Sequence, residues 1–136
     1  PASQKVLAKD IETTEKGSSG ENVANGLNKY QDVNYYFPKQ LESKSEFKDD
    51  IDSALNVGSC PLILRSRLTA DSDFGYQSSG HFMTLGGQNN GLTKVLIVDP
   101  YYGFSSIKGP DSAKYYVSFD DAYESISTHF ASQYIY

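Results

Sequence analysis

The stretch from Gly80 to Gly103 constrains the fold of this chain more than any other. Two short apolar runs, Phe82–Leu85 and Val95–Val98, have the length and residue types of β-strands. The segment between them, Gly86-Gly87-Gln88-Asn89-Asn90-Gly91, is rich in residues that favour tight turns. The sequence therefore predicts an antiparallel hairpin, with His81 just before its first strand and Asp99 just after its second.

The spacing of this hairpin predicts that His81 and Asp99 meet. His81 lies nine positions before Asn90, and Asp99 lies nine positions after it. If Asn89-Asn90-Gly91 forms a three-residue loop with Gly91 at positive φ, the two residues stand directly opposite, with Cβ atoms about 5 Å apart. An imidazole–carboxylate hydrogen bond of roughly 2.7–3.2 Å is then expected. A two-residue Asn90-Gly91 turn would place them on opposite faces, so a catalytic pair requires the longer loop or a bulge.

Composition limits the function classes. The chain has 136 residues, 12 basic and 17 acidic, and a net charge of −5 without a basic stripe, which argues against nucleic acid as a partner. No apolar run approaches the roughly 20 residues of a membrane span. Asp71-Ser72-Asp73 lacks the rest of a calcium loop, and no lysine follows the glycine pairs as in a phosphate loop, so we expect neither metal nor cofactor. The Tyr-, Ser-, Gly- and Asn-rich acidic composition fits a bacterial extracellular or cell-surface protein.

The order of apolar patterns predicts an α+β fold, with helices first and an antiparallel sheet second. Helices are expected over Pro1–Asp10 with no cap ahead, and after the patterns Ser18-x-x-Glu21, Ser43-x-x-Glu46 and Ser118-x-x-Asp121, with Gly58 ending the third. Strands are expected at 34–37 (closed by Pro38), Cys60–Leu68, Phe82–Leu85, Val95–Val98, Tyr115–Ser118 and Tyr134–Tyr136.

Two other residues invite a catalytic interpretation that we do not favour. Cys60 follows the C-terminal end of a helix, where the dipole disfavours a thiolate, and then enters an apolar strand. We therefore expect Cys60 to be buried, structural and slow to react. His129 lies near the end of the last helix, where a surface or charge–dipole role is expected. His81 alone would suit a half-buried strand end, but a facing carboxylate would fix its tautomer and support its charged form.

These residues resemble a known family. Gly80-His81, an apolar strand, glycines, a variable loop and Val98-Asp99-Pro100-Tyr101-Tyr102-Gly103 resemble the histidine and aspartate half of papain-fold cysteine peptidases. The specific likeness is to the branch related to the bacteriocin-processing, double-glycine peptidases, and it covers nearly the whole chain. Pro1-Ala2-Ser3 resembles the start of the catalytic helix, Gly20–Asn28 the second helix, and Asp52–Leu62 a helix-then-strand element in which Cys60 is non-catalytic.

The resemblance implies a papain-like α+β fold in a single domain, residues 1–136, that lacks its extreme N-terminal segment. In the family, the nucleophilic cysteine opens the first helix, followed by Gly and Pro-Ala-Ser, and an oxyanion-hole glutamine lies a few residues earlier. Both would precede Pro1. His81 would then deprotonate the cysteine, Asp99 would orient His81, and the helix dipole would stabilise the thiolate. The N-terminal end of the Pro1–Asp10 helix should accordingly point at His81.

Three functions stay open from the sequence. The first is a cysteine peptidase, a hydrolase of peptide or protein substrates, or an acyl transferase of the same fold. The second is an inactive papain-fold module that binds a peptide or a cell-wall component. The third is a structural domain of a larger secreted protein. A cysteine and glycine encoded just before Pro1 would select the first, and another residue there the second.

Overall fold

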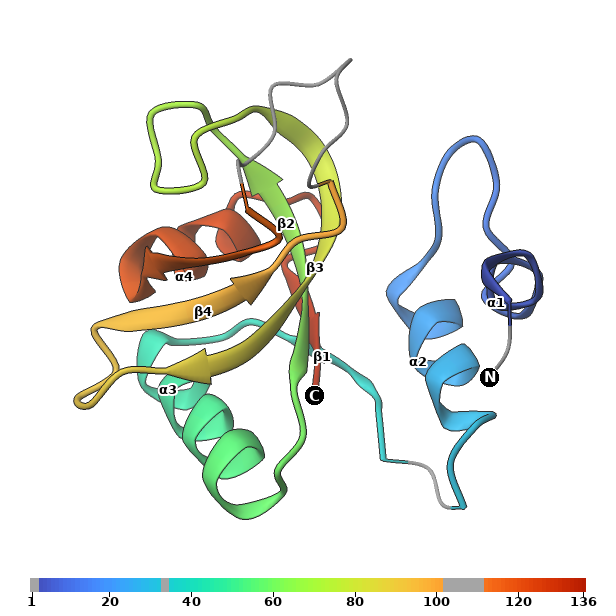
Figure 1. Ribbon diagram of the computed structural model, residues 1–136, viewed down its shortest axis with the longest axis horizontal. Coiled ribbons are helices and arrows are strands. Elements are labelled where there is room, and N and C mark those ends of the chain that lie inside the picture. The colour runs from blue at the N-terminus through green and yellow to red at the C-terminus, as the bar shows by residue number, and fades with distance from the viewer. Residues whose placement is uncertain (1–2, 33–34, 102–111) are drawn as a thin grey trace.

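An antiparallel sheet forms the centre of the molecule (Figure 1), and buried and less buried residues alternate along its strands. The structure is a computed structural model, and it describes residues 3–32, 35–101 and 112–136. Within these ranges the sheet has six strands, in the spatial order β1 (Pro38–Gln40), β6 (Gln133–Ile135), β2 (Leu62–Leu68), β3 (Ser78–Gln88), β4 (Lys94–Val98) and β5 (Lys114–Ser118). All neighbouring strands are antiparallel.

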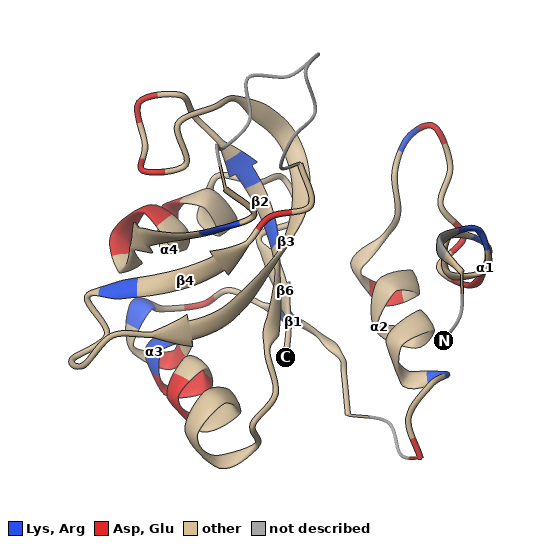
Figure 2. Cartoon of the chain, in the orientation of Figure 1, with Lys and Arg blue, Asp and Glu red and all other residues tan. Residues whose placement is uncertain are grey.

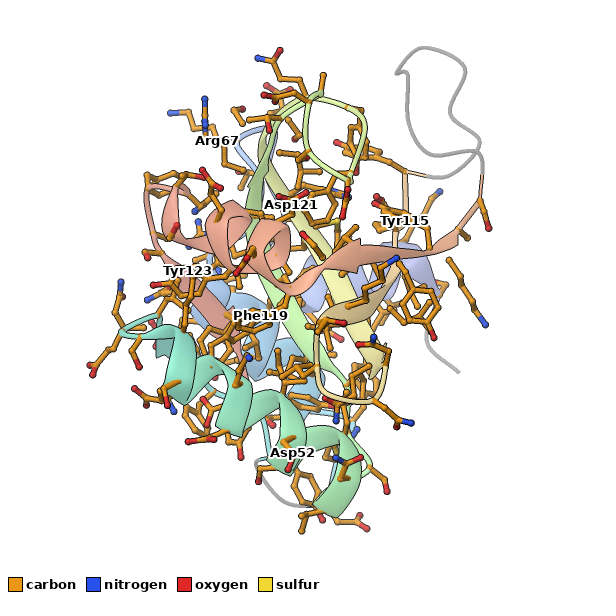
Figure 3. All side chains as sticks on the ribbon, turned by 90° about the vertical axis from the view of Figure 1, so that its left-hand side faces the viewer. Asp52, Arg67, Tyr115, Phe119, Asp121 and Tyr123 are labelled. Carbon is orange, nitrogen blue, oxygen red and sulfur yellow. The ribbon has the colours of Figure 1, made fainter. Side chains whose placement is uncertain are left out.

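Two helices cover the buried face of this sheet. α3 (Lys44–Asp52) continues as a short π-helix, η1 (Ser53–Val57), and α4 (Phe119–Ser127) follows β5 directly. Phe47 of α3 packs between Phe119 of α4 and Tyr134 of β6, with ring centroids 5.6 and 5.0 Å away. The two helices face each other at this contact, where Figure 3 labels Phe119 and Tyr123. The core therefore lies between the sheet, α3 and α4.

The remaining helices lie on the other side of the molecule (Figure 1). α1 (Gln4–Asp10) packs against α2 (Gly20–Asn28), and α2 also contacts β1 and β6. Asp10 ties the two helices together by accepting hydrogen bonds from Lys29 Nζ and Tyr30 Oη. The loop between α1 and α2 is thus carried on a helical hairpin beside the sheet. The expected α+β class, with helices before an antiparallel sheet, is confirmed.

Serine side chains begin all four α-helices in the described ranges, but two of the predicted starts are wrong. Ser43 and Ser118 cap α3 and α4 as predicted. α2 is capped by Ser19, rather than Ser18, because the Ser19 hydroxyl accepts a hydrogen bond from Asn22 N at 3.0 Å. α1 is capped by Ser3 and begins at Gln4, so the expectation of an uncapped helix was wrong; Pro1 and Ala2 lie outside the described residues.

The strand expected at 34–37 begins later, at Pro38. Phe37 and Tyr136 exchange both of their backbone hydrogen bonds at 3.0 Å, so the next pair along the ladder, Pro38 and Ile135, is a pair without mutual hydrogen bonds. At that position of an edge strand the missing N–H of proline costs no ladder bond. Proline therefore opens β1 instead of closing a strand before it, and Asn34 lies outside the described residues.

Candidate active site

His81 and Asp99 form a buried hydrogen bond at one end of the sheet. His81 shares the inner face of β3 with Met83 and Leu85, because alternate residues of a strand point to the same side. Asp99 directly follows β4. His81 Nε2 lies 2.8 Å from Asp99 Oδ1, and the two residues are only 8% and 1% exposed. The predicted contact is confirmed.

The predicted register of the hairpin is wrong, although the contact survives. Leu85 pairs with Ile97 and Gln88 with Val95, with a bulge between Leu85 and Gly87. Continuing the register places Asp99 opposite Met83, so His81 reaches it diagonally on the same face.

The loop is longer than predicted because the Asn89 side chain organises it. Asn89 Oδ1 accepts hydrogen bonds from Thr93 N at 3.0 Å and Lys94 N at 2.7 Å. The Asn89 and Lys94 backbones pair, which leaves residues 90–93 as the loop. Gly91 has the predicted positive φ, at 84°, and Leu92 has one as well, at 51°.

Three tyrosines complete the environment of Asp99. The hydroxyls of Tyr76 and Tyr115 each donate to Oδ2 at 2.6 Å, and Tyr101 N donates to Oδ1 at 2.9 Å. Burial acts to raise the pKa of Asp99, but the hydrogen bonds from His81, Tyr115, Tyr76 and Tyr101 prevail and hold the pKa well below its usual range. Asp99 is therefore a carboxylate that supports an imidazolium beside it.

The tyrosines whose hydroxyls donate hydrogen bonds to Asp99 were not predicted from the sequence. Tyr115 pairs with Ile97 across β4 and β5, which puts it on the same face as Asp99, so its role could have been found once the strand pairing was known. Tyr76 lies in the loop before β3, and no spacing marks it. Burial, and then the hydrogen bond to Asp99, raise the pKa of both hydroxyls, which stay protonated donors.

The second ring nitrogen of His81 is left available. The Tyr101 ring stacks on the imidazole at a centroid distance of 4.2 Å and an angle of 15°. Every fully buried side-chain nitrogen or oxygen in the described part of the chain has a hydrogen-bond partner. Since Nδ1 has none there, it must reach the surface. The carboxylate on Nε2 favours the tautomer that leaves the Nδ1 lone pair free to accept a proton.

His81 lines a groove with a volume of about 570 Å³. One wall is the loop between α1 and α2, including Lys16, Gly17 and Ser18, and the other contains Arg65, Gly80–Phe82, Tyr101 and Phe130. Among the described residues that line the groove, none comes from α1. The expectation that Pro1 faces His81 falls outside the described residues.

His129 is buried in this groove wall instead of lying on the surface, so that expectation was wrong. It is 4% exposed, and α4 ends before it at Ser127. Its Nδ1 accepts a hydrogen bond from Ala131 N at 3.1 Å, and its Nε2 lies 3.4 Å from the position that a Cβ on Gly80 would occupy. Burial, and then the charge of Arg65, lower the pKa of His129. The ring is therefore neutral, with its proton on the nitrogen beside Gly80.

Cys60 lies away from His81, at the other end of β2. Leu62 pairs with Leu85 whereas Ser66 pairs with His81, so the four strand steps from Leu62 to Ser66, about 13 Å, lie between the start of β2 and the residue opposite His81. Cys60 lies two residues further away. The non-catalytic position of Cys60 agrees with this placement. Cys60 is half-buried, not buried as predicted, because the chain does not enter β2 until Leu62. Gly58 ends the preceding helix as predicted, but its φ is −80°, and it is Ser59 that adopts the left-handed conformation, with φ at 52°.

The described ranges hold no group of three or more His, Cys, Asp or Glu side chains arranged to bind a metal ion. None of the helices in these ranges combines the length and the apolar character needed to cross a bilayer.

Comparison with known proteins gives one match. A family model described as the peptidase C39-like family matches residues 1–130. No curated protein and no solved structure matches the chain. The matched range includes both His81 and Asp99, and the papain-like character of the family agrees with the helices and antiparallel sheet.

Proposed function

This chain belongs to the peptidase C39-like family, and we propose that it acts as a cysteine peptidase, with His81 as general base and Asp99 as the residue that orients it. The nucleophile in this proposal is a cysteine that precedes Pro1. The observation that carries the proposal is the bond between His81 Nε2 and Asp99 Oδ1, which leaves Nδ1 open toward a groove.

The reaction follows from this arrangement in two halves. His81 Nδ1 takes the thiol proton, and the thiolate attacks the carbonyl carbon of the scissile peptide bond. As the tetrahedral intermediate collapses, the carbon–nitrogen bond breaks and His81 returns the proton to the leaving amine. Water then gives a proton to His81 as its oxygen attacks the thioester carbon. The carbon–sulfur bond breaks, the sulfur takes that proton back from His81, and the carboxylic acid product is released. Asp99 stabilises the imidazolium that forms twice in the cycle.

The test uses a longer polypeptide that adds the residues encoded before Pro1. We expect it to hydrolyse a mixed library of fluorogenic peptides, and His81→Ala to lower kcat by roughly 10²–10⁴-fold. Residues 1–136 alone should be inactive. Cys60→Ser is the matched control and should retain full turnover.

Equal turnover with and without His81 would overturn the assignment, as would loss of activity in Cys60→Ser. Peptide binding without turnover in the longer polypeptide would instead select the inactive binding module that the sequence left open.

A further inference from the structure

We propose that the groove beside His81 selects peptides that carry a carboxylate, which pairs with Arg65; the assignment of peptides as ligands rests on the proposed function. Arg65 stands opposite Phe82 in the register of β2 and β3, and the next pair along is Ser66 and His81. Successive side chains on a strand point to opposite faces, so Arg65 and Phe82 leave the sheet on the face opposite to His81, yet all three line the same groove. A peptide that occupies this groove can therefore contact both Arg65 and His81.

Arg65 is a cation without an anionic partner in the described part of the chain. Lys29, Lys39 and Lys44 each pair with a carboxylate at 2.9 Å or less. Arg65 has no such pair and no hydrogen-bond acceptor there, and instead contacts two aromatic rings. Its guanidinium carbon lies 5.7 Å from the Phe82 centroid and 5.0 Å from the Phe130 centroid.

The two phenylalanine rings favour the binding of an anion to the Arg65 guanidinium. They lie within cation–π distance of the guanidinium, and the partial burial of Arg65 lowers its pKa. The N–H groups at the edge stay available for a planar, bidentate acceptor such as a carboxylate. Phe130 is 85% exposed and offers an apolar surface beside the pair.

The charge of the groove differs from that of the whole molecule. The chain has a net charge of −5, yet no Asp or Glu among the described residues lines this groove. Figure 2 shows acidic residues gathered along α3 and α4, whereas β2 carries arginine. Lys16 also lines the groove, but it is exposed and adjacent to Glu15 at the loop tip, so Arg65 is the cation that we expect to hold the carboxylate.

The test measures binding to residues 1–136, which needs no nucleophile. The probes are fluorescein-labelled, amidated Gly/Ser heptapeptides with one Glu at each position in turn, each matched by a Gln twin. We expect the best Glu peptide to bind roughly 10–100-fold more tightly than its twin in fluorescence anisotropy. A Glu-free peptide with a free C-terminus forms a second arm, and selective binding of that peptide would assign the carboxylate to the chain end.

Arg65→Gln should remove the preference, and Arg65→Lys should keep part of it. Arg67→Gln is the matched control and should keep all of it, because Arg67, labelled in Figure 3, is exposed two residues further along β2. Arg67 is not among the residues that line this groove. Equal binding of the Glu and Gln twins, no measurable binding, or equal effects of Arg65→Gln and Arg67→Gln would overturn the proposal. If Arg65→Gln does not fold, the twin comparison on the unchanged protein and Arg65→Lys decide. A preference for Glu in a protein whose longer form cuts no peptide would remove the peptidase function and leave this inference standing.

Discussion

At the scale of single residues, the candidate site depends on how Asp99 is held. Its two oxygens receive hydrogen bonds from one imidazole, two hydroxyls and one backbone N–H. A carboxylate with this many donors is fixed in position and stays charged although it is buried. The tyrosines therefore act on His81 indirectly, by fixing the group that orients it.

Tyr115→Phe removes one of these donors and nothing else. We expect it to lower the free energy of unfolding by about 1.5–3 kcal/mol, because the lost hydrogen bond goes to a buried charge. Urea unfolding measures the change. Tyr116→Phe, one residue along β5 and 54% exposed, is the matched control and should change the free energy of unfolding by less than about 0.5 kcal/mol. Equal effects of the two variants would show that the Asp99 contact contributes nothing to stability.

The sequence was sufficient to find His81 and Asp99 but not the tyrosines that hold Asp99 in place. His81 precedes and Asp99 follows an apolar run that is recognisable in the sequence, although β3 begins earlier than predicted and includes His81. The family likeness assigns the two residues their roles. Tyr76 reaches Asp99 from a loop whose path depends on the whole fold. Arg65 lies on β2, whereas His129 lies in the segment after α4. Both line the groove, but they are far apart in the sequence, so no local pattern predicts that they meet.

At the scale of elements, serine caps made two helix starts predictable, whereas the register of the hairpin depends on a bulge and on a side chain in its loop. Serines followed three residues later by an acidic residue marked the starts of α3 and α4 correctly. The hairpin register depends on a bulge near Gly86 and on the Asn89 side chain, which accepts two backbone hydrogen bonds. Several turns were compatible with this glycine- and asparagine-rich sequence, so the residues alone did not select one.

The packing of α1 on α2 gives a prediction at this scale. A Cβ on the buried Gly26 would lie 2.2 Å from Ile11 Cγ2, which is attached to a β-branched carbon and cannot swing away easily. Gly26→Ala should therefore lower the free energy of unfolding by about 1–3 kcal/mol, even though alanine favours helices more than glycine. Asn25→Ala, at the exposed neighbouring position, should be neutral or stabilising. Stabilisation of both variants in urea unfolding would contradict the close contact.

At the scale of the whole molecule, the fold places an acidic helical layer on one side of the sheet and the groove beside His81 on another. The α+β order of the chain was predictable, because the helical and strand patterns are separated along the sequence. The position of the loop between α1 and α2 across the groove was not, since it depends on contacts of α2 with β1 and β6, which lie far apart in the sequence.

Stability against pH should reflect two buried groups whose pKa values are lowered on folding. Burial, followed by the charge of Arg65, lowers the pKa of His129 below its ordinary 6.5, so the unfolded chain alone gains a proton as pH falls below about that value. Asp99 behaves likewise below its ordinary 3.8, because its hydrogen bonds outweigh burial. In both windows the unfolded state binds more protons, so the free energy of unfolding falls as pH falls.

Urea unfolding between pH 2.5 and 8 should therefore show two decreases, one beginning near pH 6.5 and a second below about pH 4. His129→Gln should lose the first and keep the second. Asp99→Asn should be less stable at pH 7 and should flatten below pH 4, leaving only the weak slope of exposed carboxylates such as Asp120, whose ion pair is screened by water. A slope below pH 4 in Asp99→Asn as steep as in the unchanged protein would mean that Asp99 is not the carboxylate held ionised by the fold.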